Sequence, residues 1–222
     1  MLRGALIMLP LSIAVVPWGI LAGSLAVEAG LVDLQAQAVS AFIFAGSVQL
    51  VGMGLIKAGA SLSTLLLTSL FLTSRHLLYS ATMRSRISYL PIGQRIVLGF
   101  LLTDELFAVS SHLKCSEFDF HYAFGAGFSF YLVWQLASLS GILLGQSIPH
   151  LDQFGLDFAV AATFIAIVIP TIRKLSVLVT VIVSLVLSVV FSLMQIEGGL
   201  IFASLIAMVT GYLISIVRRE PL

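Results

Sequence analysis

The chain has 222 residues, of which 59% are hydrophobic and only 9% are charged, with a net charge of +1. A typical soluble domain is about one quarter charged, and the mean hydropathy here is +1.13, so the composition predicts an integral membrane protein. Solid apolar blocks, rather than the alternation of β-barrel strands, favour an all-α bundle. The charge balance does not support nucleic-acid binding. The single cysteine, Cys115, has no metal-ligand spacing around it, and we expect neither a metal nor a cofactor.

Eight apolar segments follow one another along the chain, most of them long enough to cross a membrane. They cover residues 4–27, 36–56, 61–82, 92–113, 122–147, 155–171, 174–194 and 198–217. The first resembles a cleaved signal peptide, but its two prolines and the similar later segments favour a membrane helix. Segment 36–56 is rich in glycine and segment 155–171 is short, so either could be re-entrant. We expect one membrane domain over residues 1–222 with seven or eight membrane segments.

The distribution of basic residues predicts that both termini are cytoplasmic. With the N-terminus inside, seven basic residues lie inside and three lie outside. The inside set is Arg3, Lys57, Lys114, Arg173, Lys174, Arg218 and Arg219, and the outside set is Arg84, Arg86 and Arg95. Three arginines in a short outside loop break the positive-inside rule, which is a second indication of a re-entrant segment.

The two halves of the chain resemble each other at an offset of 122 residues. GILAG at 19–23 aligns with GILLG at 141–145, and SAFI at 40–43 aligns with ATFI at 162–165. We therefore predict a duplication, with repeats at 1–121 and 122–222. An even number of crossings between the copies would make them parallel, and one re-entrant segment would make them inverted. Both arrangements occur in transporters.

Backbone breakers occupy corresponding places in the first and fifth segments. They are Pro10, Pro17 and Gly19 in the first and Gly125, Gly127 and Gly141 in the fifth. Broken helices at membrane depth free N–H and C=O groups that can bind a substrate, whereas glycines also serve close helix packing. We favour packing for each single glycine, and a substrate-binding break at Pro17-Trp18-Gly19.

Four ionisable residues lie in two neighbouring segments. Arg75 and His76 lie about two turns before the end of the third segment, and Asp104 lies about three turns into the fourth, followed by Glu105. Consecutive helices joined by a short loop are antiparallel, so Arg75 falls at the depth of the two acids and can pair with either. Each charge costs about 2.5 to 3.5 kcal/mol at the bilayer centre. The group is therefore either a salt bridge that locks the helices or a proton site.

Other polar and aromatic residues inside the segments each have two interpretations. Gln49 could contact a substrate or a neighbouring helix. Trp18 and Trp134 could line a cavity or anchor at the interface, and Asp157 could cap a helix or contact a substrate. Thr103 and Tyr79 are supporting polar groups for the acids. The candidate substrate-binding residues are Pro17, Trp18, Gly19, Gly46, Gln49, Trp134 and Asp157.

Five motifs carry a family resemblance. They are PWG at 17–19, FAGSVQ at 44–49, SRHLLYS at 74–80, TDE at 103–105 and GLDFAVAATF at 155–164. With them the chain resembles the AzlC family over nearly its whole length. The resemblance implies the large subunit of a bacterial inner-membrane exporter of valine and related branched-chain amino acids, with methionine as a further candidate. It also implies a small AzlD/YgaH-like membrane partner. Trp18, Ser47-Val48 and Thr73 depart from the usual Phe, Ala-Ser and Asn, which leaves the exact specificity open.

These features predict an exporter that exchanges an amino acid for protons. A half-helix N-terminus near Pro17–Gly19 would hold the carboxylate, and Asp104 or Glu105 would hold the ammonium group. An intramembrane protease using Asp104 and Asp157 is disfavoured, because the spans contain no H-E-x-x-H or G-x-S-x-G signature. A structural or regulatory membrane subunit is the remaining alternative.

Overall fold

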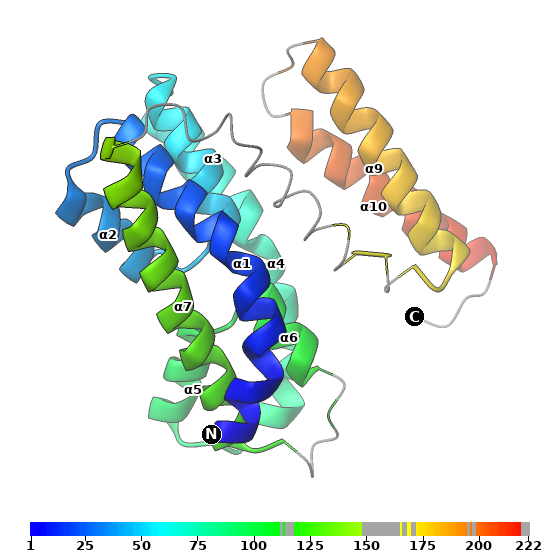
Figure 1. Ribbon diagram of the computed structural model, residues 1–222. Coiled ribbons are helices and arrows are strands. Elements are labelled where there is room, and N and C mark those ends of the chain that lie inside the picture. The colour runs from blue at the N-terminus through cyan, green and yellow to red at the C-terminus, as the bar shows by residue number, and fades with distance from the viewer. Residues whose placement is uncertain are drawn as a thin grey trace. The chain divides into compact units, whose positions relative to one another are not determined.

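The structure is a computed structural model that describes residues 1–111, 113, 118–147, 165, 168–169, 172–194, 196 and 199–218. All regular structure within these residues is helical, which confirms the all-α prediction. The chain divides into two compact units, Met1–Ala161 and Ala162–Leu222. Figure 1 labels the helices, and the two units are described separately below.

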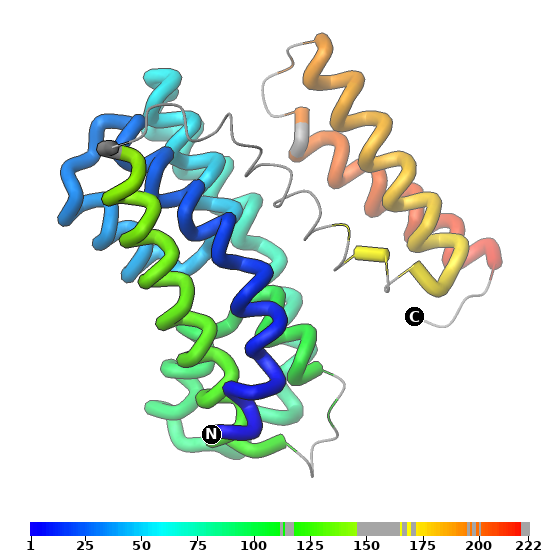
Figure 2. The backbone as a smooth tube through the Cα atoms, viewed as in Figure 1, coloured from blue at the N-terminus to red at the C-terminus, as the bar shows by residue number. Residues whose placement is uncertain are grey.

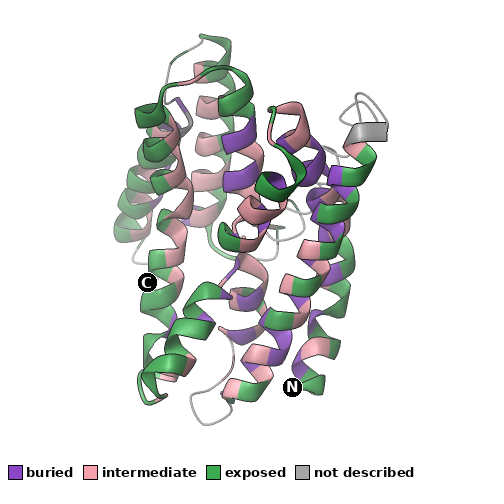
Figure 3. Cartoon of the chain, turned by 90° about the vertical axis from the view of Figure 1, so that its left-hand side faces the viewer, coloured by how far each residue is buried: buried purple, intermediate pink, exposed green. Residues whose placement is uncertain are grey.

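The N-terminal unit contains seven described helices. They are α1 (Leu2–Glu28), α2 (Asp33–Phe42), α3 (Gly46–Lys57), α4 (Leu62–Ile87), α5 (Ile92–Phe100), α6 (Asp104–Ser110) and α7 (Phe120–Ser147). Buried positions form bands along the helices (Figure 3), and the exposed positions include many large apolar residues, as expected of a surface in contact with lipid.

Helices α1 and α7 run parallel and pack against each other along most of their length (Figure 1). Small residues allow their backbones to touch: a Cβ atom on Gly4 would overlap the carbonyl oxygen of Tyr122, and one on Gly141 would overlap that of Ile20. Gly145 likewise faces Ser24, so the GILAG and GILLG motifs lie beside each other. Glycines of this kind are typical of close helix association in membranes, and the packing interpretation is confirmed.

The predicted breaks in the first and fifth segments are wrong. Helix α1 continues through Pro10 and Pro17, and α7 continues through Gly125, Gly127 and Gly141, as the uninterrupted tubes in Figure 2 show. Each proline removes one backbone hydrogen bond, but membrane helices tolerate this loss where neighbouring helices support the chain. The close α1–α7 contact supplies that support, so no half-helix begins at Pro17–Gly19.

The first break lies instead between α2 and α3, at residues 43–45. Four residues separate the end of α1 from the start of α2. Helix α3 ends at Lys57, whose Nζ lies 2.7 Å from Oε2 of Glu28 at the end of α1. Both ends of segment 33–57 therefore lie at the Glu28 end of the unit. The second segment, one of the two that we expected could be re-entrant, thus returns to the end of the unit where it begins, and we name it hairpin 33–57.

A second break lies between α5 and α6, at residues 101–103. Arg86, at the end of α4, donates from Nε to the carbonyl of Leu113 and from Nη2 to that of Ser111, each at 2.7 Å. The chain after α6 is thus held at the same end as the turn that precedes α5. Residues 92–110 form a second re-entrant segment, hairpin 92–110, and the prediction of one crossing over 92–113 is wrong.

The two hairpins enter from opposite ends of the unit, and their tips touch. Phe44, in the first break, lies with its ring centroid 6.1 Å from that of Phe100, at the end of α5. Phe44 also packs edge-on against Tyr131 of α7, at 5.0 Å. The same order, helix then hairpin then helix, thus occurs twice in opposite directions: α1, hairpin 33–57 and α4, then α4, hairpin 92–110 and α7.

Hairpin 33–57 also changes the predicted positions of the charges. Because this segment returns to the end where it entered, Lys57 lies at the opposite end from Arg3. Helix α4 then brings Arg84 and Arg86 back to the Arg3 end, where α7 begins beside α1. The predicted sides of Lys57, Arg84 and Arg86 relative to Arg3 are therefore wrong. With Arg84 and Arg86 at the Arg3 end, these two arginines no longer break the positive-inside rule.

The C-terminal unit contains the described helices α9 (Leu175–Leu193) and α10 (Gly199–Val217). They are antiparallel neighbours: Gly199 lies against Phe191, and Gly211 lies against Thr180. Among the described residues, α1, α7 and α9 meet the length and hydropathy expected of membrane-spanning helices, and α10 is a shorter apolar helix. The count of seven or eight crossings is not confirmed, and the duplication and its boundaries stay predictions.

Candidate functional site

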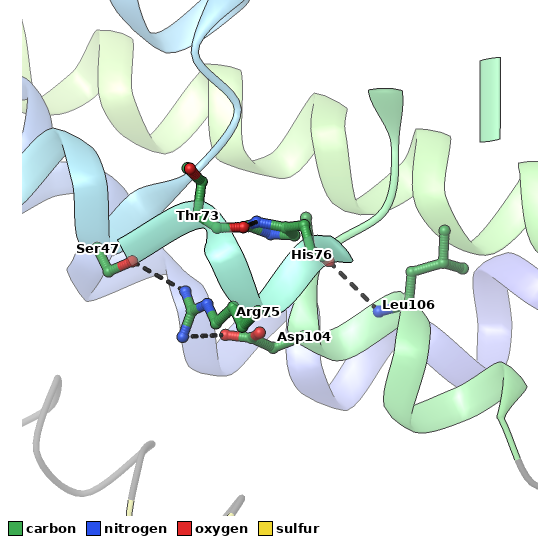
Figure 4. Close-up of polar contacts among 7 residues, drawn as sticks. Ser47, Thr73, Arg75, His76, Asp104 and Leu106 are labelled. Atoms are coloured by element: carbon green, nitrogen blue, oxygen red, sulfur yellow. Dashed lines mark hydrogen bonds and ion pairs between the residues drawn. The ribbon is translucent and has the colours of Figure 1, made fainter. Parts of the chain in front are cut away.

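An ion pair lies where the two hairpins meet α4. Arg75, in the middle of α4, places Nη1 2.9 Å from Oδ2 of Asp104, the first residue of α6. Its Nη2 donates a 2.8 Å hydrogen bond to Oγ of Ser47, at the start of α3. One guanidinium group therefore bridges the beginnings of two half-helices (Figure 4). The prediction that Arg75 pairs with an acid of the TDE motif is confirmed.

Thr103 places the two acids at the start of α6. Its Oγ1 accepts a 3.3 Å hydrogen bond from the backbone N–H of Leu106, which is the N-cap geometry. Asp104 and Glu105 then occupy the first turn, where negative charge is stabilised by the helix dipole. Only Asp104 pairs with Arg75. Glu105 is half-buried and, among the described residues, forms no salt bridge.

The ion pair keeps unused hydrogen-bonding capacity. Nε of Arg75 and Oδ1 of Asp104 are both buried and have no hydrogen-bond partner among the described residues. The side chains are 30% and 13% exposed, so the pair lies at the edge of the packed interior. A buried charged group without its full set of partners is costly. The site therefore offers one spare donor and one spare acceptor.

An aromatic contact connects His76 with the helix that bears the acids. Nδ1 of His76 lies 3.2 Å from the carbonyl oxygen of Thr73, one turn earlier in α4. The His76 ring meets Tyr79 edge-on at 5.8 Å, and Tyr79 stacks on Phe107 of α6 at 4.4 Å. The structure thus brings His76 and Tyr79 beside α6. A proton role for His76, Asp104 or Glu105 stays a prediction.

Gln49 stabilises the first break. Its Nε2 donates to the carbonyl of Ile43, which the break leaves without a helical partner, and its Oε1 accepts from Oγ of Ser40 at 3.3 Å. The Ser40 hydroxyl also makes a short hydrogen bond with that of Ser138 in α7. These side chains are almost fully buried. Of the two interpretations, the contact with neighbouring helices is the one that the structure describes.

Four residues of this network were not among the predicted site residues: Gln37, Ser40, Gln135 and Ser138. Gln135 donates to the carbonyl of Ser40 at 2.8 Å and accepts from Gln37 at 2.7 Å. The available signal was the spacing of small polar residues in otherwise apolar helices, since such residues commonly bond across membrane helices.

The two tryptophans lie inside the N-terminal unit. Trp18 and Trp134 are 7% and 2% exposed, so neither is an interface anchor. A Cβ atom on Gly46 would lie 2.9 Å from Cη2 of Trp134 and 3.4 Å from Cε3 of Trp18. The two rings therefore pack against the first residue of α3, and only a glycine fits there without displacing them.

Of three further predicted substrate residues, Gly19 has a packing role, Pro17 lies within a continuous helix, and one cannot be placed. A Cβ atom on Gly19 would meet Ala137 of α7, and Pro17 lies within continuous α1. Neither belongs to a helix break. Asp157 lies outside the described residues.

Apolar helices of membrane-spanning length, together with an ion pair between α4 and the break in hairpin 92–110, define a polytopic membrane protein with a polar site within its N-terminal unit. The chain belongs to the AzlC family: the family profile, described as AzlC protein, matches residues 10–148. That match covers α1 from Pro10 onward and all of α2 to α7, including Arg75 and Asp104.

Several relatives carry the description of a membrane protein. The chain is 30% identical over 184 residues to the inner membrane protein YgaZ of Escherichia coli strain K12, which covers 78% of this chain and 74% of the relative. It is 28% identical over 173 residues to an uncharacterized membrane protein of Archaeoglobus fulgidus, covering 77% and 75%. It is also 32% identical over 153 residues to one of Helicobacter pylori strain 26695, covering 67% and 65%. No solved structure matches the chain.

Proposed function

We propose that this protein exports branched-chain amino acids, valine and its relatives, with methionine as a further candidate, across a bacterial inner membrane. The observation that carries the proposal is the Arg75–Asp104 ion pair, which lies where two re-entrant hairpins meet. In transporters, substrate sites commonly lie at such discontinuous helices near the bilayer midplane. The name of the Escherichia coli relative supports the location in the inner membrane.

The spare groups of the ion pair match the backbone of an amino acid. An α-amino acid carries a carboxylate, which needs donors, and an ammonium group, which needs acceptors. Nε of Arg75 is a buried donor and Oδ1 of Asp104 a buried acceptor. The carboxylate would bind Arg75 and the N-terminus of α3, whose N-cap residue, Ala45, offers no side-chain cap. The ammonium group would bind Asp104, with Glu105 as the alternative.

Export would be coupled to protons moving in the opposite direction. Asp104 is the acid paired with Arg75, which leaves Glu105 and His76 as the groups that carry the proton. A carrier must bind either the substrate or the proton in the same region. Asp104 and Glu105 lie in the first turn of α6, and His76 lies in α4.

The transport unit would be a heteromer with a small AzlD/YgaH-like membrane subunit, in which this chain is the large subunit. Both termini would be cytoplasmic. For the N-terminus, Arg3, Arg84 and Arg86 lie at one end of the N-terminal unit and Lys57 at the other, and by the positive-inside rule this distribution supports a cytoplasmic Arg3 end.

The test is efflux from vesicles preloaded with labelled valine, containing this chain with and without the small subunit. We expect valine efflux that depends on a pH gradient, and we expect Asp104→Asn to abolish it. Asp119→Asn is the matched control, because Asp119 is an exposed helix cap and asparagine caps equally well.

The outcomes separate the alternatives. Unchanged, still pH-dependent efflux in Asp104→Asn would remove Asp104 from the mechanism. Efflux that depends only on the partner, and that no substitution in this chain alters, would favour a structural or regulatory subunit. Release of a cleaved product would favour the intramembrane enzyme.

A further inference from the structure

An open pocket of about 240 Å³ lies at one end of the C-terminal unit. It is formed by the start of α9 and the end of α10, which are antiparallel neighbours (Figure 1). Its polar lining residues are Lys174, Ser176, Thr180, Tyr212 and Ser215. A single water molecule needs about 10 to 15 Å³ of such space, so the pocket has room for a group of several heavy atoms.

Basic residues cluster at this end of the C-terminal unit. Arg173 and Lys174 directly precede α9, and Arg218 directly follows α10. Gly211 lies against Thr180, so in the same antiparallel register Arg218 falls level with Arg173. The described part of the C-terminal unit contains these three cations and neither Asp nor Glu. The described charges beside the pocket are thus all positive.

The length of α9 places the pocket at a membrane surface. Helix α9 has 19 residues and is apolar enough to cross the hydrocarbon core, so its first residue lies near one edge of that core. Lys174 precedes this residue, and Thr180 lies six residues further along, or about 9 Å along the helix axis. The pocket therefore extends from the headgroup level to the outer part of the acyl chains. The basic residues favour the cytoplasmic leaflet, whose anionic lipids attract such residues.

The lining suits a ligand that is anionic at one end and apolar at the other. The hydroxyls of Thr180 and Ser215 already donate to backbone carbonyls, so the ammonium group of Lys174 and the hydroxyl of Tyr212 supply the donors for an anion. Val177 and Gly211 add apolar wall, which would serve the start of an acyl chain. A free phosphate ion would use only the charged end of such a pocket.

We propose that this pocket binds the phosphate-bearing headgroup of an anionic phospholipid. Lys174, Arg173 and Arg218 bind the phosphate, and the glycerol end of the lipid lies between α9 and α10 beside Val177. Basic pockets between membrane helices on the cytoplasmic side commonly bind anionic headgroups. The site lies within the C-terminal unit, and the proposal does not depend on amino acid export.

The test is the retention of phosphatidylglycerol by the full chain in a neutral detergent, measured by native mass spectrometry over a range of lipid concentrations. We expect one tightly held phosphatidylglycerol per chain and much weaker retention of phosphatidylcholine. A basic residue near an anionic lipid surface contributes about 5-fold to affinity. The double variant Arg173→Gln with Arg218→Gln should therefore weaken phosphatidylglycerol retention at least about 10-fold.

Two controls separate the pocket from general attraction by charge. Arg84→Gln with Arg95→Gln removes the same charge from exposed positions of the N-terminal unit, and should leave the tightly held lipid in place. Ser215→Leu keeps every charge but fills the pocket, and should weaken retention as the first double variant does. Ser192→Leu, an exposed position at the other end of α9, should not.

Three results would overturn the proposal. Equal losses in the two double variants would mean that charge alone attracts the lipid. Full retention in Ser215→Leu would place the lipid outside the pocket. Displacement of the lipid by an excess of inorganic phosphate would identify a site for free anions instead. If one variant does not fold, the other variant and its control decide the question.

Discussion

Removing one partner of the Arg75–Asp104 pair should destabilise the protein more than removing both partners. Arg75→Gln leaves the Asp104 carboxylate buried without its cation. Losing one partner of a buried pair costs about 3 to 5 kcal/mol, and a lone acid at the bilayer centre costs about 2.5 to 3.5 kcal/mol on insertion scales. The pair is 30% and 13% exposed, so we expect a value near the lower end, about 3 kcal/mol.

The double variant, Arg75→Gln with Asp104→Asn, tests the cause of that loss. Because both charges are gone, part of the stability should return, and the coupling energy should be about 1 to 3 kcal/mol. The assay is reversible unfolding in mixed micelles for the wild type, both single variants and the double variant. Lys57→Gln is the control, because the exposed Lys57–Glu28 pair contributes only about 0 to 1 kcal/mol. Strictly additive losses in the four proteins would refute the reasoning, since they would mean that the two charges do not stabilise each other.

Three further predictions concern the framework of the site, and each is measured by thermal unfolding in detergent. Gly141→Ala should cost at least about 1 to 3 kcal/mol, because its Cβ would overlap backbone atoms of Ile20. Gly54→Ala should instead stabilise the protein by about 0.5 to 1 kcal/mol, because its Cβ would meet nothing within 4 Å. Equal effects of the two substitutions would contradict close α1–α7 packing. Gln49→Leu should cost about 1 to 3 kcal/mol, because the carbonyl of Ile43 loses its side-chain donor and keeps only the N–H of Ala45, and the buried hydroxyl of Ser40 loses an acceptor; a neutral result would show that the remaining hydrogen bonds are sufficient. Although burial raises the pKa of Asp119, hydrogen bonds at the start of α7 lower it to below its usual value. Its stabilising contribution should therefore be present at neutral pH and lost as the pH falls below about 4, with Asp119→Ala showing no such acid-dependent loss.

The sequence allowed the ion pair to be predicted because depth along antiparallel helices can be counted. Arg75 lies about two turns before the end of one apolar segment, and Asp104 about three turns into the next, so a rise of about 1.5 Å per residue places them together. This count gave the correct pairing even though the segment that contains Asp104 is a hairpin rather than a crossing. The entering arm of the hairpin, α5, reaches the same depth as the first half of a full span would.

The positions of the helix breaks were harder to predict, since proline and glycine pointed elsewhere. Pro17 lies in continuous α1, supported by α7 more than 100 residues away in the chain, and such long-range support leaves no local signal. A local signal did exist at the second break. Thr103 followed by Asp104 and Glu105 is the signature of a helix start, and its position inside an apolar run could have revealed the hairpin.

The first break has no comparable signature. Residues 43–45 read Ile-Phe-Ala, with neither proline nor glycine among them. What stabilises this break is the side chain of Gln49, which bonds to the carbonyl of Ile43, and the packing of Trp134 on Gly46. These are tertiary contacts, and only the glycine content of the segment hinted at them. The corrected positions of the basic residues follow from this one hairpin.

The charges at the site also explain why two neighbouring acids are tolerated in an apolar region. Arg75 contributes one positive charge, and the N-termini of α3 and the shorter α6 each contribute up to about half a charge. Together they approximately balance Asp104 and Glu105. A zwitterionic amino acid adds no net charge to this balance, whereas an organic cation or anion would leave an uncompensated charge in a low-dielectric site. The near-neutral balance therefore favours a zwitterionic amino acid as substrate. The spare donor on Arg75 and the spare acceptor on Asp104 suggest the same substrate class independently.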